Sequence, residues 1–292
     1  MNRPSTTVVA PTLMIVGATS MYVGAAIAVV LFDTLSPSAV AWLRIAGAAV
    51  ALVAWARPGA AAWHRSRLLL AGSFGLITAA MNIAFYEALA RLPLGTTVAL
   101  EFLGPVAVAA VGSRTRRDVA ALLLAVVGVI LIADVHWAGT PGGVLLALTA
   151  AACWAGYIVL GKRVARRGSG IEDLATGFVV AAVLTSPLAL GLGPAFADDA
   201  PTTRLLVAGL AVGIASTAIP YALDQVVLAR VGQARFALLL ALLPVTACIV
   251  GAVALGQIPR PVEAIGIVAV AAAVAVRSSD DPDPEPAEFG GR

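Results

Sequence analysis

Apolar runs of about 20 residues recur from one end of this sequence to the other, and only short polar interruptions separate them. A hydrocarbon layer of about 30 Å requires helices of that length. Backbone polar groups in lipid must be paired within the segment, which favours helices over open sheets. The sequence therefore predicts an all-α polytopic membrane protein.

The composition agrees with this class. The 292 residues are 60% hydrophobic and only 12% charged, whereas soluble domains are about 25% charged. The interruptions are too short to hold a soluble catalytic domain. The formal net charge of +3 reflects membrane topology, so it gives no reason to expect nucleic-acid binding.

Turn residues and charges divide the chain into ten predicted transmembrane helices. The predicted spans are about 12–32, 36–56, 68–88, 93–113, 118–135, 142–162, 173–193, 204–226, 233–254 and 261–277. An N-terminal segment, residues 1–11, precedes them, and an acidic, proline-rich tail, residues 278–292, follows and is predicted to be disordered.

Basic residues predict the orientation of these spans. Fifteen of the nineteen Lys and Arg residues fall on the side that holds both termini, three fall on the other side, and Arg44 lies inside a span. Positive charge concentrates in cytoplasmic loops. We therefore expect a multi-pass protein of the inner membrane with both termini in the cytoplasm and anionic-lipid contacts at its basic loops.

An internal repeat divides the chain into two halves. The segment LARLPLGTTVALEFLGPV from Leu89 aligns without a gap with LARVGQARFALLLALLPV from Leu228. This predicts two five-helix repeats, residues 12–135 and 142–277, here called the first and second halves. Five is an odd number, so the second repeat enters the membrane inverted, which is typical of secondary transporters.

Two prolines occupy matching places in the two halves. Pro105 and Pro244 lie well inside their predicted spans, where proline removes a backbone hydrogen bond and bends or breaks the helix. Paired interruptions of this kind point to a transport site, although kinks that serve packing alone are the alternative.

The run from Pro93 to Pro105, PLGTTVALEFLGP, with NIAFYEALARLPLG before it, resembles the EamA-type members of the drug/metabolite transporter superfamily. IPYALD, residues 219–224, resembles the second-half counterpart. The branch it most resembles is that of bacterial threonine/homoserine exporters. The resemblance implies proton-driven export through a central cavity lined by both halves. Leu243 and Gln257 stand where family members often carry acids, so coupling or gating through those acids is not implied here.

One acid and one base lie at matching depth in the membrane. Glu101 and Arg44 each fall eight residues inside their spans, about 12 Å deep at 1.5 Å per residue. A charge at that depth costs about 2.5–3.5 kcal/mol and requires a partner. The two side chains either pair with each other or bind the two ends of a zwitterion, with Arg44 on the carboxylate and Glu101 on the ammonium group. Glu101 is also a candidate carrier of the coupling proton.

Further polar and aromatic residues are candidates for the same site, each with packing as the alternative. Asn82 and Tyr86, spaced i, i+4, share one helix face. The other candidates are Tyr22, Trp154 and Tyr157 as aromatic walls and Asp224 as a gate or a helix-end ion pair.

Other notable residues are expected to be structural. Glu87 and Arg91 form a local i, i+4 salt bridge, and the GxxxG pair Gly209 and Gly213 packs helices. The two cysteines are apolar packing residues. The sequence shows no metal-ligand spacing, and we expect no metal or cofactor.

These observations predict a proton-coupled exporter of small amino acids such as threonine or homoserine, acting as a monomer or a homodimer. The alternative within the same fold is another solute, such as an aromatic, cationic or purine-like compound. An enzyme is not expected, because the sequence lacks GxSG, GxGD and HExxH motifs. A membrane scaffold would not explain the acid, base and paired prolines near mid-membrane.

Overall fold

The computed structural model describes residues 6–112, 116–136, 140–165, 170–193, 202–220, 223, 227, 239–240 and 242–278. Within these residues all regular secondary structure is helical. The first half contains α1 (Thr6–Leu31), α2 (Pro37–Ala56), η1 (Ala60–Trp63), α3 (Arg65–Leu89), α4 (Leu94–Glu101), α5 (Leu103–Gly112) and α6 (Arg116–His136). The second half contains α7 (Pro141–Ala165), α8 (Gly170–Leu184), η2 (Ser186–Leu192), α10 (Thr202–Gly213), η3 (Ile214–Ala218), α12 (Leu242–Leu255) and α13 (Pro261–Ser278).

Several of these helices have the length and composition of membrane spans. Four long apolar segments qualify within the described residues: Val9–Leu31, Pro37–Ala56, Arg65–Leu89 and Pro141–Leu160. Shorter apolar helices, including α12 and α13, accompany them. The prediction of an all-α polytopic membrane protein is therefore confirmed, while the count of ten spans and the inverted repeat stay predictions.

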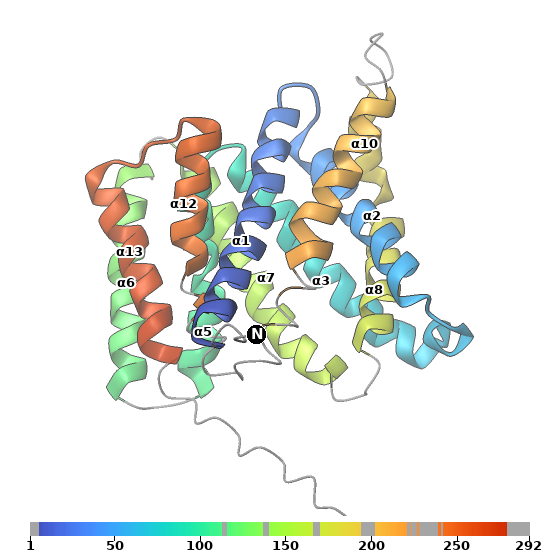
Figure 1. Ribbon diagram of the computed structural model, residues 1–292, viewed down its shortest axis with the longest axis horizontal. Helices are drawn as coiled ribbons and strands as arrows, with labels where there is room; N and C mark the ends of the chain where they lie inside the picture. Colours follow the sequence, from blue (N-terminus) through green and yellow to red (C-terminus); the bar gives the residue numbers. More distant parts are fainter. Residues whose placement is uncertain are drawn as a thin grey trace, which may run out of the picture.

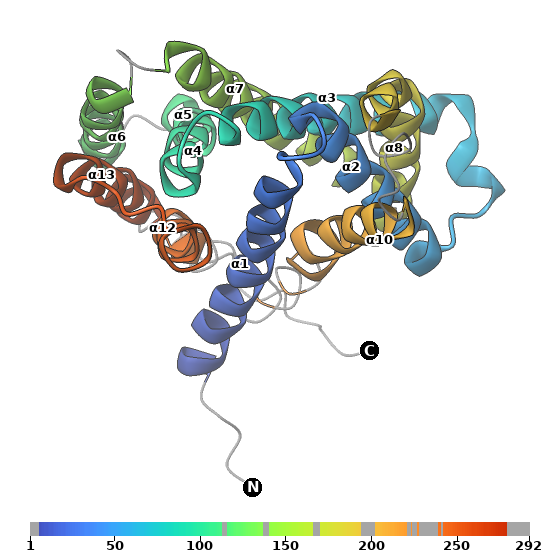
Figure 2. The same cartoon turned by 90° about the horizontal axis from the view of Figure 1, so that it is seen from above.

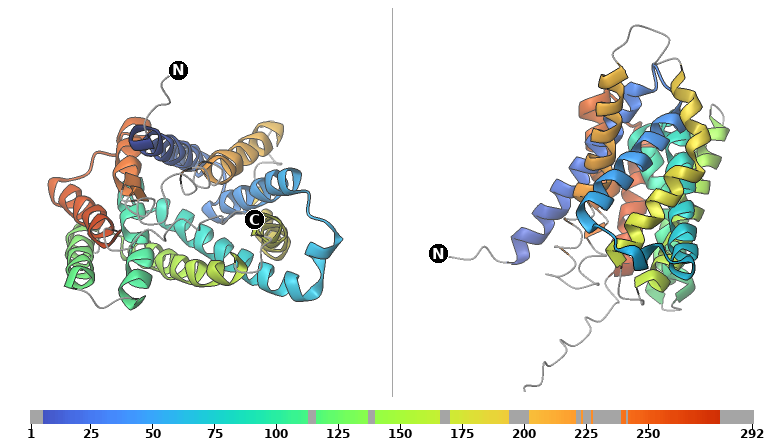
Figure 3. Two further views of the ribbon diagram at one scale, coloured as in Figure 1. Left: turned by 60° about the horizontal axis from the view of Figure 1, so that its bottom comes forward. Right: turned by 90° about the vertical axis from the view of Figure 1, so that its right-hand side faces the viewer.

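The helices form two facing rows that are closed at the ends (Figures 1 and 2). One row holds α12, α1 and α10, and the other holds α5, α7 and α3 (Figure 3, left). At one end α6 packs along α13, and at the other end α2 packs against α8. Toward its start α1 slants away from the other helices (Figure 3, right).

Glycines allow the two halves to approach closely, and two of these contacts involve paired glycines on facing helices. In the contact between α3 and α8, a Cβ added at Gly75 would lie 2.0 Å from the carbonyl oxygen of Gly177. In the contact between α10 and α2, a Cβ at Gly213 would lie 2.9 Å from the carbonyl carbon of Gly47. Small residues of this kind let membrane helices pack backbone to backbone. The prediction that Gly209 and Gly213 pack helices is confirmed, because a Cβ at Gly209 would lie 2.8 Å from the Leu43 side chain.

The span predicted at 93–113 is two helices rather than one. The first, α4, ends at Glu101, and the second, α5, begins at Leu103, two residues before Pro105. Proline at position 105 lacks the N–H that would bond the carbonyl of Glu101, and its ring crowds that carbonyl. The break therefore falls one turn before the proline.

The span predicted at 173–193 also differs from a single straight helix. It bends by 59° between α8 and η2. Pro187 lies at the start of η2, where its ring disfavours continuation of the preceding α-helix. The proline pair pointed to helices four and nine only, so the bend at Pro187 was not predicted.

Candidate functional site

Arg44 is the eighth residue of α2, and its guanidinium group reaches across to the second half. Its Nε donates to Thr217 Oγ1 at 3.4 Å, and its Nη2 donates to the carbonyl oxygen of Ser216 at 3.1 Å. Both acceptors are neutral. Among the described residues, no carboxylate makes an ion pair with Arg44.

The acceptors belong to η3, a single π-helical turn that continues α10. Carbonyls around such a turn are out of register with the α-helical pattern, and two of them accept side-chain donors here. Besides the bond from Arg44, the carbonyl of Ala215 accepts from Ser20 Oγ at 2.9 Å. The turn thus links α1 and α2 of the first half to the second half.

Tyr86 of α3 lies under the same guanidinium group. The centre of its ring is 5.5 Å from Arg44 Cζ, within the range of a cation–π interaction. The side chain is fully buried, and its hydroxyl has no hydrogen-bond partner among the described residues. Asn82, one turn earlier, is also buried, and its Nδ2 donates to the carbonyl of Thr78 at 2.7 Å.

Glu101 is the last residue of α4 and, like Arg44, the eighth residue of its helix. Its side chain is partly buried. Within the described part of the chain it makes no ion pair. Arg44 nevertheless lies within electrostatic reach of this carboxylate, as does Cys153. The two predicted site charges are thus neighbours that do not touch.

The predicted aromatic residues divide between two places. Trp154 of α7 packs edge-on against Phe102, the residue after Glu101, with ring centres 4.8 Å apart. Tyr157 stacks on Phe74 of α3 at 4.7 Å, in the contact between α3 and α7. Tyr22 is buried on α1. Trp154 therefore contacts the residue next to the acid, and Tyr157 belongs to a helix contact.

The predicted gating residues are only partly described. Pro105 and Pro244 are each the third residue of their described helix, α5 and α12. The residue before α12, position 241, and Asp224 lie outside the described residues. A matching break in the second half and a gating role for Asp224 therefore stay predictions.

One predicted ion pair is confirmed at the end of α3. Arg91 Nη1 lies 2.7 Å from Glu87 Oε2, and the other carboxylate oxygen accepts from Ser38 Oγ at 2.5 Å. Ser38 lies in the first turn of α2 and Glu87 in the last turn of α3, so the cluster joins two helices of the first half near solvent.

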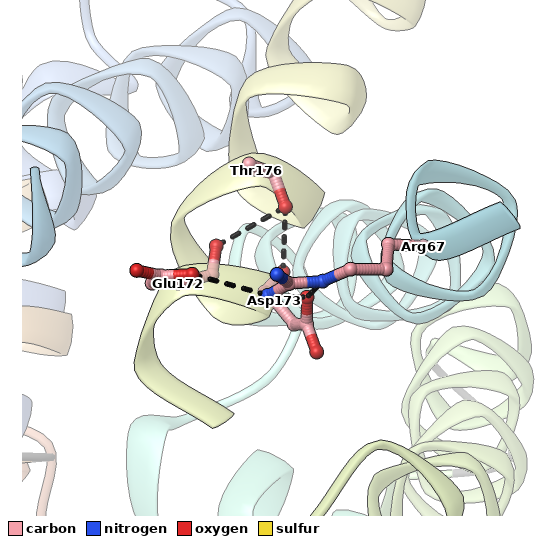
Figure 4. Close-up of polar contacts among 4 residues, drawn as sticks. All are labelled: Arg67, Glu172, Asp173 and Thr176. Atoms are coloured by element: carbon pink, nitrogen blue, oxygen red, sulfur yellow. Dashed lines mark hydrogen bonds and ion pairs between the residues drawn. The ribbon is translucent and has the colours of Figure 1, made fainter. Parts of the chain in front are cut away.

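A second arginine is bound in a different way, between the starts of α3 and α8 (Figure 4). Arg67 Nε and Nη2 donate to Asp173 Oδ1 at 3.0 and 2.8 Å, and Nη2 also donates to Glu172 Oε2 at 3.2 Å. The side chain of Asp173 is only 4% exposed. This cluster fastens the first half to the second.

Sequence reasoning missed the polar residues that contact the site and the start of α4. Ser216 and Thr217 are a Ser-Thr pair inside an apolar span, which is a signal that could have marked them. Glu263 of α13 is buried and accepts a hydrogen bond from Thr96 of α4. Gln257 Oε1 accepts from the backbone N–H of Leu94 at 2.8 Å, so it caps the start of α4.

The described cavities lie away from these charges. One of about 430 Å³ lies between α1 and α12, and another of about 700 Å³ lies between α2 and α8. Their linings are mainly apolar and include neither Arg44 nor Glu101. Among the described residues, no cluster of His, Cys, Asp and Glu could hold a metal ion.

Known proteins resemble this chain in sequence or in fold. The model of the EamA-like transporter family matches residues 141–279. Threonine/homoserine exporter RhtA of Escherichia coli (strain K12) is 34% identical over 263 residues, which cover 88% of this chain and 87% of that protein. RhtA of Salmonella typhimurium (strain SL1344) is 33% identical over the same shares.

One solved crystal structure agrees in fold alone. It superposes with a TM-score of 0.56 and 18% sequence identity, and the match covers 92% of this chain and 94% of the other. The membrane helices, the family model and the identity to full-length relatives lead to one conclusion. The chain belongs to the EamA-type drug/metabolite transporter family.

Proposed function

We propose that this transporter exports small amino acids such as threonine and homoserine from the cytoplasm, by proton antiport and alternating access. The observation that carries the proposal is the pair Arg44 and Glu101. Among the described residues each lacks a partner of opposite charge in direct contact, yet they lie within electrostatic reach of each other. An amino acid carries the two complementary charges at a short fixed spacing.

Arg44 binds the substrate carboxylate in this proposal. Its contacts to Ser216 and Thr217 are to neutral oxygens, so its full positive charge is available to a ligand. A guanidinium group binds carboxylates through parallel hydrogen bonds. The buried hydroxyl of Tyr86, beside Arg44, is a further donor for the same carboxylate.

Glu101 binds the substrate ammonium group and also carries the coupling proton. A carboxylate that holds a proton no longer attracts an ammonium group, so the two cations compete for one site. Protonation from the outside releases the amino acid there, and proton loss to the cytoplasm restores the carboxylate for the next substrate. One proton therefore enters for each substrate that binds Glu101 and leaves. Asn82, Tyr22, Trp154 and Tyr157 complete the proposed surroundings.

The proposed architecture is ten spans in two inverted repeats in the inner membrane, with both termini cytoplasmic. Two packing contacts support the repeat. The glycine contact between α3 and α8 joins the third helix of the first half to the second helix of the second half. The contact between α10 and α2 joins the third helix of the second half to the second helix of the first. Exchanging the halves maps one contact onto the other, as an inverted repeat requires.

The names of the relatives support the substrate. The proteins that are 33–34% identical are threonine/homoserine exporters. The rival is the same fold with an aromatic, cationic or purine-like solute, and a panel of solutes separates the two.

Efflux of labelled threonine and homoserine from cells that overproduce the chain tests the proposal. We expect faster efflux than in cells with empty vector, and growth at otherwise toxic amino-acid concentrations. Equal efflux from both strains, with the protein present in the membrane, would overturn the amino-acid assignment. Efflux of a purine or aromatic compound instead would favour the rival.

A further inference from the structure

The π-helical turn η3 is the part of the second half that contacts Arg44. We infer that this turn aims the Arg44 guanidinium at the substrate carboxylate, with Thr217 as a positioning residue that does not itself touch the substrate. The inference rests on the proposed function, because it assumes that Arg44 binds a carboxylate.

The contacts use one particular edge of the guanidinium group. Nε and Nη2 form that edge, and they donate to Thr217 Oγ1 and to the Ser216 carbonyl. The group is planar with its donors in a fixed fork. Fixing the Nε–Nη2 edge therefore directs the Nη1 end away from η3. Among the described residues, no hydrogen bond to Nη1 is found, so this end is available to a carboxylate.

The acceptors are themselves held in place. Ser216 and Thr217 are 1% and 2% exposed, so water does not compete for them. Ser216 Oγ donates to the carbonyl of Met21 at 3.1 Å. A Cβ added at Gly24 of α1 would lie 2.2 Å from Ser216 Oγ, which shows how closely α1 covers the turn.

The arginine backbone is fixed against the same segment. A Cβ at Gly213, the residue before η3, would lie 2.8 Å from the carbonyl oxygen of Arg44. The backbone carbonyl and the guanidinium group of Arg44 thus both lie against one short stretch, residues 213–217. The stacked ring of Tyr86 supports the face of the guanidinium group. Arginine in this setting is held in one orientation, which lowers the entropy lost on binding a carboxylate.

The turn has a geometric reason for being π-helical. An i→i+5 turn displaces carbonyls from the α-helical register and is found frequently at functional sites. Here the displaced carbonyls of Ala215 and Ser216 accept from Ser20 and Arg44. A regular α-helix would pair the Ser216 carbonyl with the N–H four residues on, but that residue is Pro220, which has no N–H. Pro220 therefore leaves this carbonyl without an α-helical partner, and Arg44 uses it as an acceptor.

Kinetics in proteoliposomes test this role. Thr217→Val keeps the shape of the side chain and removes Oγ1, while Thr217→Ser retains the oxygen. Thr246→Val is the matched control, because among the described residues Thr246 Oγ1 donates only to the carbonyl of Leu242 in its own helix. The substrates are threonine and threoninol, the amino alcohol in which a hydroxymethyl group replaces the carboxylate.

We expect Thr217→Val to raise the KM for threonine about tenfold, the effect of one hydrogen bond to a charged group, with kcat within about twofold of the wild type. Thr217→Ser should restore the KM, and the KM for threoninol should not change. Thr246→Val should behave as the wild type. Thr217→Ala serves in place of the valine variant if that variant does not fold.

Two results would overturn the inference, and they differ in what else they reject. If the wild type transports threonine and Thr217→Val leaves that transport unchanged, the positioning role alone is rejected. The same conclusion follows if Thr217→Val lowers transport of threonine and of threoninol by equal factors. A wild type that moves no amino acid rejects the proposed function and this inference together.

Discussion

Two arginines join the halves of this transporter, and they are bound by different kinds of acceptor. Arg67, at the starts of α3 and α8, contacts two carboxylates, one of them nearly fully buried. Arg44, eight residues into α2, contacts a hydroxyl and a backbone carbonyl. Both link the first half to the second, but only Arg67 is neutralised by side chains that the structure describes.

We interpret the difference as that between a structural charge, Arg67, and a charge available to the proposed substrate site, Arg44. The charge of an arginine that is paired with two carboxylates is already neutralised, so it binds a third carboxylate weakly. An arginine bound by neutral oxygens retains its positive charge and can bind an anionic ligand. Charges at membrane depth are retained when they serve transport or find a partner. The surroundings of each arginine, more than its depth, therefore indicate its role.

Replacement of Arg44 should have the largest effect. Arg44→Ala removes the proposed carboxylate donor, and two charge-assisted hydrogen bonds of about 1.5 kcal/mol or more each correspond to about a hundredfold loss in kcat/KM for threonine. Initial rates in proteoliposomes measure it, with Arg91→Ala as the control. A kcat/KM within twofold of the wild type would remove Arg44 from the site.

Replacement of Glu101 should remove the coupling to protons. Glu101→Gln keeps the size of the side chain but neither gains nor loses a proton, so we expect at least a tenfold slower export. The residual rate should not respond to a gradient that drives protons inward, which accelerates the wild type. Glu87→Gln is the control, since Glu87 is bound to Arg91 and Ser38. A gradient response that survives in Glu101→Gln would place the proton elsewhere.

Replacement of Arg67 should affect stability more than transport. Arg67→Ala leaves the buried carboxylate of Asp173 without its arginine, and an uncompensated buried charge destabilises a protein. For Arg67→Ala we expect a lower Tm in detergent and a KM for threonine close to that of the wild type. The double variant Arg67→Ala/Asp173→Ala should recover part of the lost Tm. Thermal unfolding and transport on the same samples measure both. A large increase in KM at an unchanged Tm would make Arg67 a site residue instead.

The smallest effect should come from Arg91. Its side chain is 42% exposed, and exposed i, i+4 pairs contribute about 0.3–0.5 kcal/mol. We expect Arg91→Ala to unfold within about 2 °C of the wild type, the shift that corresponds to that energy in a protein of this size. A much larger shift would mean that the Glu87 cluster, through Ser38, stabilises the contact between α2 and α3.

Much of the architecture could be predicted from the sequence, because membrane helices follow from local composition. The apolar runs predicted the all-helical membrane class, and the GxxxG pair predicted a helix-packing contact, which α10 makes with Leu43 of α2. Breaks and bends within the helices were harder to predict from the sequence. The break after Glu101 lies three residues before Pro105. The bend after Leu184 depends on Pro187, which lies outside the two aligned repeat segments and so was not marked by the repeat.

The candidate site was predictable in its charges but not in its contacts. Glu101 and Arg44 stand out as ions in apolar runs, and the structure brings them near each other without an ion pair. The bonds from Arg44 to Ser216 and Thr217 span more than 170 positions in sequence. They depend on a π-helical turn that hydrophobic periodicity does not reveal. Likewise, the bond between Gln257 and Leu94 requires the packing of two distant helix ends.

The most direct test of the proposed zwitterion site measures how two variants transport two substrate analogues, each of which lacks one charged group. Proteoliposomes with the wild type, Arg44→Ala or Glu101→Gln are given homoserine, its amino alcohol without the carboxylate, or 4-hydroxybutyrate, which lacks the amino group. The wild type should prefer homoserine to both. Arg44→Ala should lose only the preference for homoserine over the amino alcohol. Glu101→Gln should lose only the preference for homoserine over 4-hydroxybutyrate. If both variants keep the wild-type preferences, neither charge binds the substrate.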